Sequence, residues 1–174
     1  AGYLREMLQD PNIGSIDVVD WSHELPELLQ SPIVVSKIGN SISDDRVFLH
    51  KGDAKLAISL FDAKSFDIVI DNLTYPTWVG STGLRSVSFF ADIARILKYD
   101  GTYVLTTNYS RLRNEILTGL TENFTTVSEN IDAHVVFSSQ KPVVIDLSQV
   151  SSLATKNADD ANMTVYTLEN ILVN

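Results

Sequence analysis

The sequence predicts an α/β fold in which a mostly parallel sheet lies between layers of helices and is closed by an antiparallel strand pair. The first observation is that short apolar segments alternate along the chain with segments of helical periodicity. The second is that these apolar segments are typical of strands buried on both faces, as in parallel sheets. The third is that two further strand-like segments follow each other directly, which favours an antiparallel finish.

The N-terminal part of the chain is predicted to hold a helix and two strands. Leu4, Met7 and Leu8 recur at helical spacing, and the turn at 11–14 ends this helix. The first strand, at 16–20, ends on an acid. The predicted elements are a helix at 3–9, strands at 16–20 and 46–50, one or two helical turns within 23–30, and a turn-rich stretch at 31–45.

The remainder of the chain continues the alternation of helices and strands. Val87, Phe90 and Ile93 mark one face of a helix, and Asp100-Gly101 is predicted to form a turn before the next strand. The predicted elements are helices at 55–61, 87–97 and 112–120, strands at 66–71 and 102–107, and a closing strand pair at 124–129 and 133–139.

The composition excludes several classes of function. The chain has 174 residues without a linker or repeat, so a single domain over 1–174 is expected. Lys and Arg number 13 against 22 Asp and Glu, and this net charge of −9 disfavours nucleic-acid binding through phosphate contacts. The sequence contains no cysteine, which excludes a disulfide framework, a Cys-ligated metal and a thiol nucleophile.

Neither a membrane span nor a metal site is expected. No apolar run approaches about 18 residues, the length that a membrane helix requires. The first residues lack the basic and apolar regions of a secretory signal, so a cytoplasmic location is expected. His23, His50 and His134 are scattered without the spacing of metal ligands.

Polar side chains follow the predicted strands at the sheet edge where open α/β folds bind ligands. Asp20 ends the first strand, Asp53 follows the second within G-D-A, and Asn72 follows the third. A strand-terminal carboxylate can accept both hydroxyls of a ribose. An Asp after Gly can accept from the exocyclic amine of adenine, since the Gly lets the base approach. The alternative for either Asp is a helix N-cap or a turn.

Several short motifs follow one another in the order of a known family. They are I-D-V-V-D-W at 16–21, D-D-R-V at 44–47, H-K-G-D-A at 50–54, F-D-I-V-I at 66–70, D-G-T-Y-V-L at 100–105 and N-A-D-D at 157–160. Together they resemble the spermidine synthase family, within the Rossmann-like S-adenosylmethionine-dependent methyltransferase superfamily. The resemblance covers nearly the whole chain. It implies a Rossmann-like three-layer sandwich, a transferase of polyamine biosynthesis, a small-molecule amine substrate and a homodimer.

The resemblance also implies a nucleoside donor, S-adenosylmethionine or decarboxylated S-adenosylmethionine, and no metal. Asp20 would hold the ribose and Asp53 the adenine. Trp21 and Ala54 would lie beside the base, although a place in the core is the alternative for Trp21. Gly2 would stand at the end of the family's glycine-rich loop. The family's first strand and the rest of this loop should precede Gly2, and both are expected to be missing.

The residues at the site of chemistry depart from the family pattern. The family strand typically reads Y-D-V-I-x-L-D-L-T-D-P, and this chain reads F-D-I-V-I-D-N-L-T-Y-P at 66–76. The family's catalytic acid therefore falls on Asn72, its second acid on Tyr75, and its leucine on Asp71. Asn cannot take a proton near neutral pH and Tyr supplies no fixed charge, so impaired polyamine synthesis is expected. Asp71 points to the opposite face unless a bulge turns it.

Two alternatives remain open at this point. Asn72 to Tyr75 also resembles the N-P-P-Y motif of amino-group methyltransferases, with Leu73 and Thr74 in place of the prolines. This resemblance would make the protein a methyltransferase that uses S-adenosylmethionine on a small amine. The other alternative is a catalytically silent relative, retained as a dimerising or regulatory module.

Overall fold

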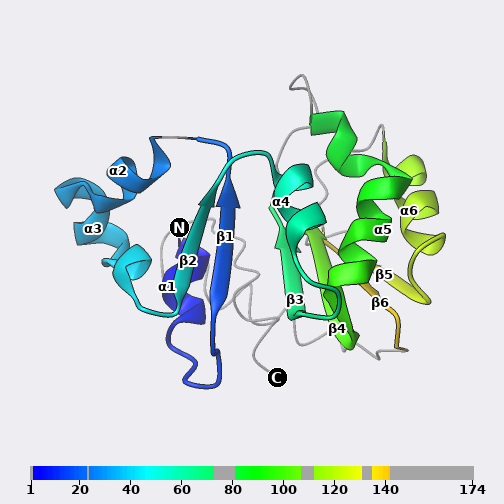
Figure 1. The fold of residues 1–174 in the computed structure, drawn as a ribbon, viewed down its shortest axis with the longest axis horizontal. Helices are drawn as coiled ribbons and strands as arrows, with labels where there is room; N and C mark the ends of the chain where they lie inside the picture. Colours follow the sequence, from blue (N-terminus) through cyan, green and yellow to red (C-terminus); the bar gives the residue numbers. More distant parts are fainter. Residues whose placement is uncertain (1, 23, 73–80, 107–111, 131–134, 142–174) are drawn as a thin grey trace. The chain divides into compact units, whose positions relative to one another are not determined.

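The computed structural model describes residues 2–22, 24–72, 81–106, 112–130 and 135–141. The chain divides into two compact units (Figure 1). Unit 1 comprises residues 1–54 with 146–174, and unit 2 comprises residues 55–145. Compact units are not by themselves separate domains, so the single domain expected over 1–174 stays a prediction.

Unit 1 holds a pair of parallel strands and several short helices. Its elements are α1 (Gly2–Met7), β1 (Ile16–Asp20), α2 (Leu25–Gln30), α3 (Pro32–Ile38), the 3-10 helix η1 (Ser41–Ser43) and β2 (Val47–Lys51). The two strands pair in parallel, with Ile16 opposite Val47 and Asp20 opposite Lys51. Both strands and the helical turns within 23–30 lie where the sequence predicts them, with β2 shifted by one residue.

Helix α3 corrects the prediction that residues 31–45 are turn-rich throughout. Pro32 stands in the first turn of this helix, where a missing N–H loses no hydrogen bond. Gly39 follows the last residue with a φ of 72°, and its N–H donates to the Val35 carbonyl at 2.9 Å. The proline and the glycine, which suggest turns, are here the two ends of a helix.

Arg46 ties the start of β2 to the chain that follows α1. Its Nη2 donates to the Leu8 carbonyl at 2.8 Å. Its Nη1 donates to the carbonyls of Asp10 and Ile13 at 3.2 and 3.3 Å. Its Nε donates to Asp44 Oδ1 at 3.0 Å, and this bond lowers the pKa of the Asp44 carboxyl. The arginine of the D-D-R-V motif therefore has a structural role.

Unit 2 is a four-stranded sheet with helices packed on it (Figure 1). Its elements are α4 (Ala54–Leu60), β3 (Phe66–Asp71), the 3-10 helix η2 (Ser81–Arg85), α5 (Val87–Ile96), β4 (Leu97–Thr106), α6 (Arg113–Thr121), β5 (Thr126–Asn130) and β6 (Val135–Ser139). The strand order is β3-β4-β6-β5. Strands β3 and β4 are parallel, and β6 is antiparallel to both β4 and β5. The predicted antiparallel finish is therefore confirmed. The parallel strands that the sequence places in one mostly parallel sheet are instead divided between the β1–β2 pair of unit 1 and this four-stranded sheet, in which only β3 and β4 pair in parallel.

Strand β4 begins earlier than predicted, because Asp100 and Gly101 lie within it rather than in a turn. The pairing of β4 with β3 is irregular at this point. A Cβ at Gly101 would lie 2.9 Å from the carbonyl oxygen of Asp67, so glycine permits the close approach of the two backbones. Helix α5 accordingly ends at Ile96, before the predicted end at 97.

The first strand of the closing pair begins later than the sequence predicts. Strand β5 begins at Thr126 instead of 124, because Phe124 turns into the core instead of joining the ladder. Residues 133 and 134 of the predicted second strand lie outside the described residues. The antiparallel register places Thr126 opposite Ser139.

The core of unit 2 lies where α5 and α6 pack on the sheet. Tyr103 of β4 is fully buried at its centre, with ring centroids 6.2 Å from Phe90 and 6.0 Å from Phe124. Val87, predicted on the core-facing side of α5, is instead 47% exposed at its first turn. The buried side chains of the two helices are Phe89, Phe90, Ile93, Ile96, Ile116 and Leu120.

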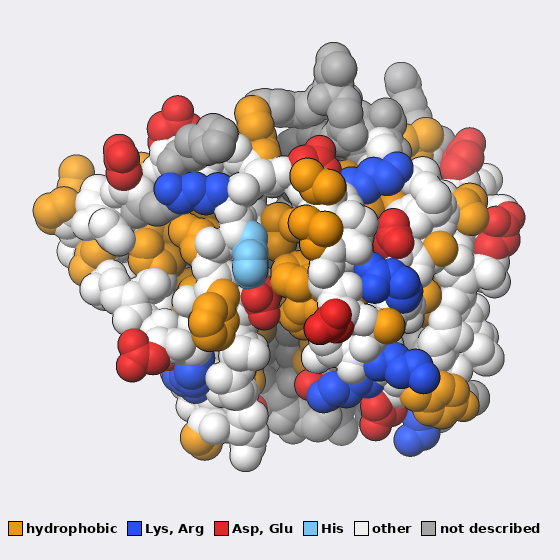
Figure 2. All heavy atoms as spheres, viewed as in Figure 1, with side chains coloured by type: hydrophobic (Ala, Val, Ile, Leu, Met, Phe, Trp, Pro, Cys, Tyr) orange, Lys and Arg blue, Asp and Glu red, His pale blue; other side chains and the backbone are white. Residues whose placement is uncertain are grey.

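Large apolar side chains also lie on the surface of each unit (Figure 2). Ile33 of α3 is 74% exposed and Leu60 of α4 is 76% exposed. In the ranges that the structure describes, no helix combines the length and apolarity that crossing a bilayer demands.

Candidate functional site

Asp20 and Asp53 lie at the same edge of the β1–β2 pair. Asp20 is the last residue of β1, and its carbonyl accepts from the Gly52 N–H at 2.9 Å just beyond the end of β2. Gly52 has a φ of 147°, a conformation that favours glycine, and open space surrounds the position of a Cβ. Asp53 follows at once and precedes α4. The parallel pairing therefore brings both acids to one edge, as the sequence predicts.

The Asp20 carboxylate takes part in a local turn. Its Oδ1 accepts from the Ser22 N–H at 2.8 Å, which is the turn role that was the alternative for this residue. A carboxylate has a second oxygen and further lone pairs, so this bond leaves acceptor capacity for a ligand. The role of Asp20 toward a ribose stays a prediction.

Three other residues are predicted on the donor side, Trp21, Ala54 and Gly2. Trp21 follows Asp20 and is 64% exposed, which corrects the alternative that placed it in the core. Ala54 is the first residue of α4, and Gly2 is the first residue of α1. Their contacts with a nucleoside stay predictions.

Asp71 and Asn72 point in opposite ways at the end of β3. The Asp71 side chain is 6% exposed, whereas Asn72 is exposed. Asp71 pairs with Leu105 of β4 in regular register, and the irregularity of this ladder lies at the other end of the strand. No bulge therefore turns Asp71 outward, and the alternation of the strand directs its side chain inward.

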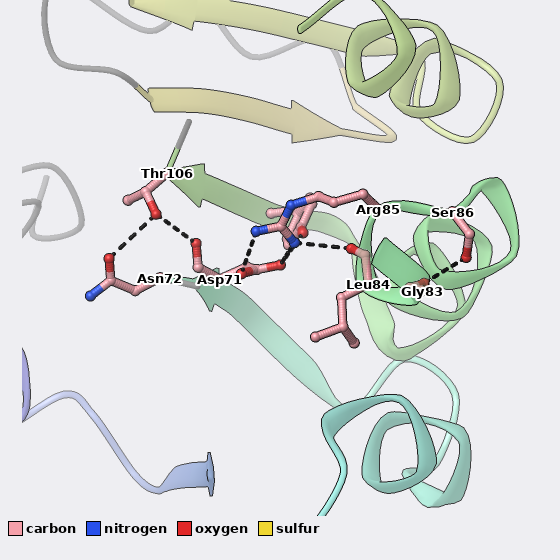
Figure 3. A network of polar contacts seen from close by, with 8 residues as sticks. Asp71, Asn72, Gly83, Leu84, Arg85, Ser86 and Thr106 are labelled. Atoms are coloured by element: carbon pink, nitrogen blue, oxygen red, sulfur yellow. Dashed lines mark hydrogen bonds and ion pairs between the residues drawn. The ribbon is translucent and has the colours of Figure 1, made fainter. Parts of the chain in front are cut away.

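The buried carboxylate of Asp71 is held by two side chains (Figure 3). Arg85 Nη1 lies 2.6 Å from Oδ2 and Nη2 lies 3.3 Å from Oδ1, so the guanidinium binds both oxygens. The Tyr103 hydroxyl donates to Oδ2 at 2.9 Å. Burial, followed by the negative charge of Asp71, raises the pKa of the Tyr103 phenol well above its usual value. The phenol therefore stays a neutral hydrogen-bond donor.

Thr106 joins the two residues at the end of β3 (Figure 3). Its Oγ1 lies 3.2 Å from the Asp71 carbonyl oxygen and 3.3 Å from Asn72 Oδ1. Thr106 is the last residue of β4, which lies beside β3, so the sheet itself brings this hydroxyl to Asn72. Tyr75, the other residue predicted to face an acceptor, lies outside the described residues.

Sequence reasoning missed Arg85, Tyr103 and Thr106. One signal was available, because an Asp within an apolar strand requires a partner when it is buried. The identity of that partner was not readable, since Arg85 lies 14 positions further along the chain and Tyr103 lies 32 positions further.

The described residues contain no group of three side chains placed to hold a metal ion. His50 lies across the β1–β2 pair from Asp17, with Nε2 2.6 Å from Oδ1. His23 and His134 lie outside the described residues.

Comparison with known proteins gives consistent results. The spermine/spermidine synthase domain family matches residues 1–158. A polyamine aminopropyltransferase 2 of Streptomyces coelicolor is 30% identical over 98 residues, 56% of this chain and 18% of that protein. A polyamine aminopropyltransferase of Bacillus subtilis is 28% identical over 121 residues, 69% of this chain and 42% of that protein. The chain thus spans less than half the length of these curated relatives.

The fold is also found in solved structures. A spermidine synthase in complex with the transition state analogue AdoDATO superimposes with a TM-score of 0.67 and 17% identity, over 80% of this chain and 51% of that one. The likeness confirms the predicted Rossmann-like three-layer α/β fold.

Proposed function

The chain belongs to the spermine/spermidine synthase family, and from this premise we propose that it is an aminopropyltransferase-type protein that binds a nucleoside donor and makes little polyamine. The donor is S-adenosylmethionine or its decarboxylated form. The observation that carries the proposal is the contrast at the end of β3, where Asn72 is exposed and Asp71 is buried against Arg85. The donor side, by comparison, keeps its acids, Asp20 and Asp53.

Asp20 and Asp53 hold the donor in this proposal. The carboxylate of Asp20 accepts from the ribose hydroxyls through the lone pairs that its hydrogen bond with the Ser22 N–H does not use. Asp53 accepts from the adenine amine, and Gly52 has the open backbone that lets the base approach. Trp21 and Ala54 lie beside the base, and Gly2 lies toward the methionine-like end. The AdoDATO complex of the related spermidine synthase supports a nucleoside ligand for this family.

The reaction implied by the family transfers an aminopropyl group. The acceptor amine nitrogen attacks the aminopropyl carbon that is bound to the sulfonium sulfur of the donor. A C–N bond forms as the C–S bond breaks, methylthioadenosine leaves, and the amine gives up a proton. An amine is protonated near pH 7, so a base placed beside it accelerates this step.

The residues at the end of β3 supply no such base. The amide of Asn72 cannot accept the proton at neutral pH. The carboxylate of Asp71 is engaged by Arg85 and Tyr103 and faces the core of unit 2. We therefore place Asn72 toward the acceptor as a hydrogen-bonding residue and give Asp71 no part in proton transfer.

Calorimetry of the purified chain tests the donor site. We expect binding of methylthioadenosine and of decarboxylated S-adenosylmethionine, with little aminopropyl transfer to putrescine in a parallel assay. The absence of binding by any of these nucleosides would reject the proposal and favour the catalytically silent relative.

A methyltransferase that acts on a small amine is the second candidate. The exposed amide of Asn72 favours it, because such an amide can accept from a target amine without removing its proton. The same calorimetry separates the two candidates. Tighter binding of S-adenosylmethionine than of its decarboxylated form, with methyl transfer to an amine, would favour the methyltransferase.

The family resemblance supports three further proposals. We infer one domain over residues 1–174, a homodimer and a cytoplasmic location, with a small-molecule amine as the substrate partner. Light scattering of the purified chain tests the dimer.

A further inference from the structure

The Asp71–Arg85 ion pair is buried at the end of β3. Both side chains of the pair are 6% exposed. Apolar residues of similar volume are commonly as stable as a buried ion pair, so stability alone does not explain two charges at this place. A buried pair can instead fix one geometry of the groups around it.

The pair joins elements that the chain separates. Asp71 ends β3, and Arg85 ends η2, on the far side of residues 72–84. Arg85 Nη1 also donates to the Leu84 carbonyl at 2.9 Å, which fixes the guanidinium relative to its own backbone. Tyr103 of β4 adds a third attachment through its hydroxyl. The end of β3 is therefore held by contacts from η2 and β4 together.

A hydroxyl continues these contacts to Asn72. Thr106 Oγ1 lies within 3.3 Å of both the Asp71 carbonyl oxygen and the Asn72 side-chain oxygen. The Thr106 hydroxyl has a single hydrogen, which the two acceptor oxygens share. Each hydrogen bond is therefore weak by itself, but the two together fix the orientation of the hydroxyl. Figure 3 shows the resulting series from Arg85 through Asp71 to Thr106 and Asn72.

We propose that Arg85 and Thr106 are positioning residues for Asn72. Arg85 holds the Asp71 side chain, and Thr106 holds the backbone at Asp71 and the amide of Asn72. Neither residue contacts a substrate in this proposal. The inference rests on the proposed function in one respect, the place of Asn72 toward the acceptor. All the contacts that support it lie within unit 2.

The test compares substitutions that keep the volume of each side chain. Asp71→Leu with Arg85→Leu removes both charges and leaves neither ion buried alone. Thr106→Val removes the hydroxyl, and Thr106→Ser retains it. The matched control is Asp67→Leu with Lys98→Leu, which removes an exposed pair at 2.8 Å between β3 and β4. Circular dichroism and melting curves confirm that each variant is folded.

Backbone amide hydrogen exchange is the readout that does not depend on activity. We expect exchange at residues 71, 72 and 85 to accelerate by about tenfold in the Leu–Leu pair variant and in Thr106→Val. Thr106→Ser and the Asp67–Lys98 control should exchange as the unmodified chain does. Unchanged exchange in both the Leu–Leu pair variant and Thr106→Val would overturn the proposal.

Aminopropyl transfer in an Asn72→Asp background is the second readout. Thr106→Val should lower kcat by about tenfold or more with the donor KM unchanged, and Thr106→Ser should restore it. Accelerated exchange with an unchanged kcat would reduce the residues to a structural role and overturn the proposal. Accelerated exchange with no activity in any variant, Asn72→Asp included, would support the positioning and refute the proposed function.

Discussion

The Tyr103 hydroxyl donates to Asp71 Oδ2 over 2.9 Å, and the same carboxylate oxygen lies 2.6 Å from Nη1 of Arg85. Tyr103 is fully buried and Asp71 nearly so. A phenol and a guanidinium thus share one buried anion at the end of β3. The residue next to this anion is Asn72, so the network affects both the stability of unit 2 and its candidate site.

Arg85→Leu should lower the free energy of unfolding by about 3–5 kcal/mol, because it leaves the Asp71 carboxylate buried without its counter-charge. Urea denaturation measures this loss. The control is Lys98→Leu, which removes the cation of the exposed Asp67–Lys98 pair and should change stability by about 1 kcal/mol or less. Equal losses in the two variants would contradict a buried ion pair at Asp71.

Stability should fall at alkaline pH because of Tyr103. Below about pH 10, the usual pKa of tyrosine, its phenol is protonated in both the folded and the unfolded chain. Above that pH the unfolded chain loses the proton, whereas the folded chain keeps it, since the folded-state pKa is raised. The free energy of unfolding should then fall by up to about 1.4 kcal/mol per pH unit.

Tyr103→Phe isolates this contribution from that of the other tyrosines. Urea unfolding of both proteins between pH 8 and 11 gives the slope of the free energy of unfolding against pH for each. This range spans the usual tyrosine pKa of about 10. The slope of the variant should be shallower above pH 10. Parallel curves would mean that the phenol ionises in the folded chain as it does in water.

Gly101→Ala should destabilise the chain by about 1–3 kcal/mol, because the added Cβ would overlap the Asp67 and Lys98 backbone carbonyl oxygens at 2.9 and 3.0 Å. Gly14→Ala is the matched control, since nothing lies within 4 Å of its Cβ position. Thermal melting of both variants checks the prediction. A melting temperature of Gly101→Ala equal to that of Gly14→Ala would show that β3 and β4 separate at little cost.

Asp20→Ala should weaken the binding of methylthioadenosine by about 1–3 kcal/mol, the usual cost of leaving buried hydrogen-bond partners unpaired. Calorimetry measures the affinity, and a melting curve shows whether the loss of the Ser22 bond disturbs unit 1. Asp45→Ala, at an exposed acid of the same unit, is the control. Unchanged affinity in Asp20→Ala would reject the ribose role.

Asn72→Asp should raise aminopropyl transfer from decarboxylated S-adenosylmethionine to putrescine by about 10²–10⁴-fold, because it places a base at the end of β3. The assay compares it with the unmodified chain and with Asp71→Asn. High turnover by the unmodified chain that Asp71→Asn abolishes would show that Asp71, and not Asn72, is the residue that corresponds to the family's acid.

The sequence determined where the strands lie and which family the chain resembles. Apolar runs at 16–20, 46–50, 66–71 and 102–107 became strands to within one residue at most boundaries, except the early start of β4, because short apolar runs bounded by turn residues leave a strong local signal. The expected burial on both faces was wrong for β1, β2 and β3, whose residues are mostly partly or fully exposed. It also placed Asp20 and Asp53 at one edge, since parallel neighbours end together. Pro32 and Gly39 misled the prediction, because proline and glycine occur in turns and also at the start and the end of helices.

Only the tertiary structure decided what surrounds Asp71. The strand period directs its side chain inward, but the period says nothing of the partner that a buried carboxylate requires. Arg85 and Tyr103 reach it from η2 and β4, and Thr106 reaches Asn72 from the end of β4. These contacts join residues that lie 14 to 35 positions apart in the sequence. Such residues meet only when the sheet and the helices have packed.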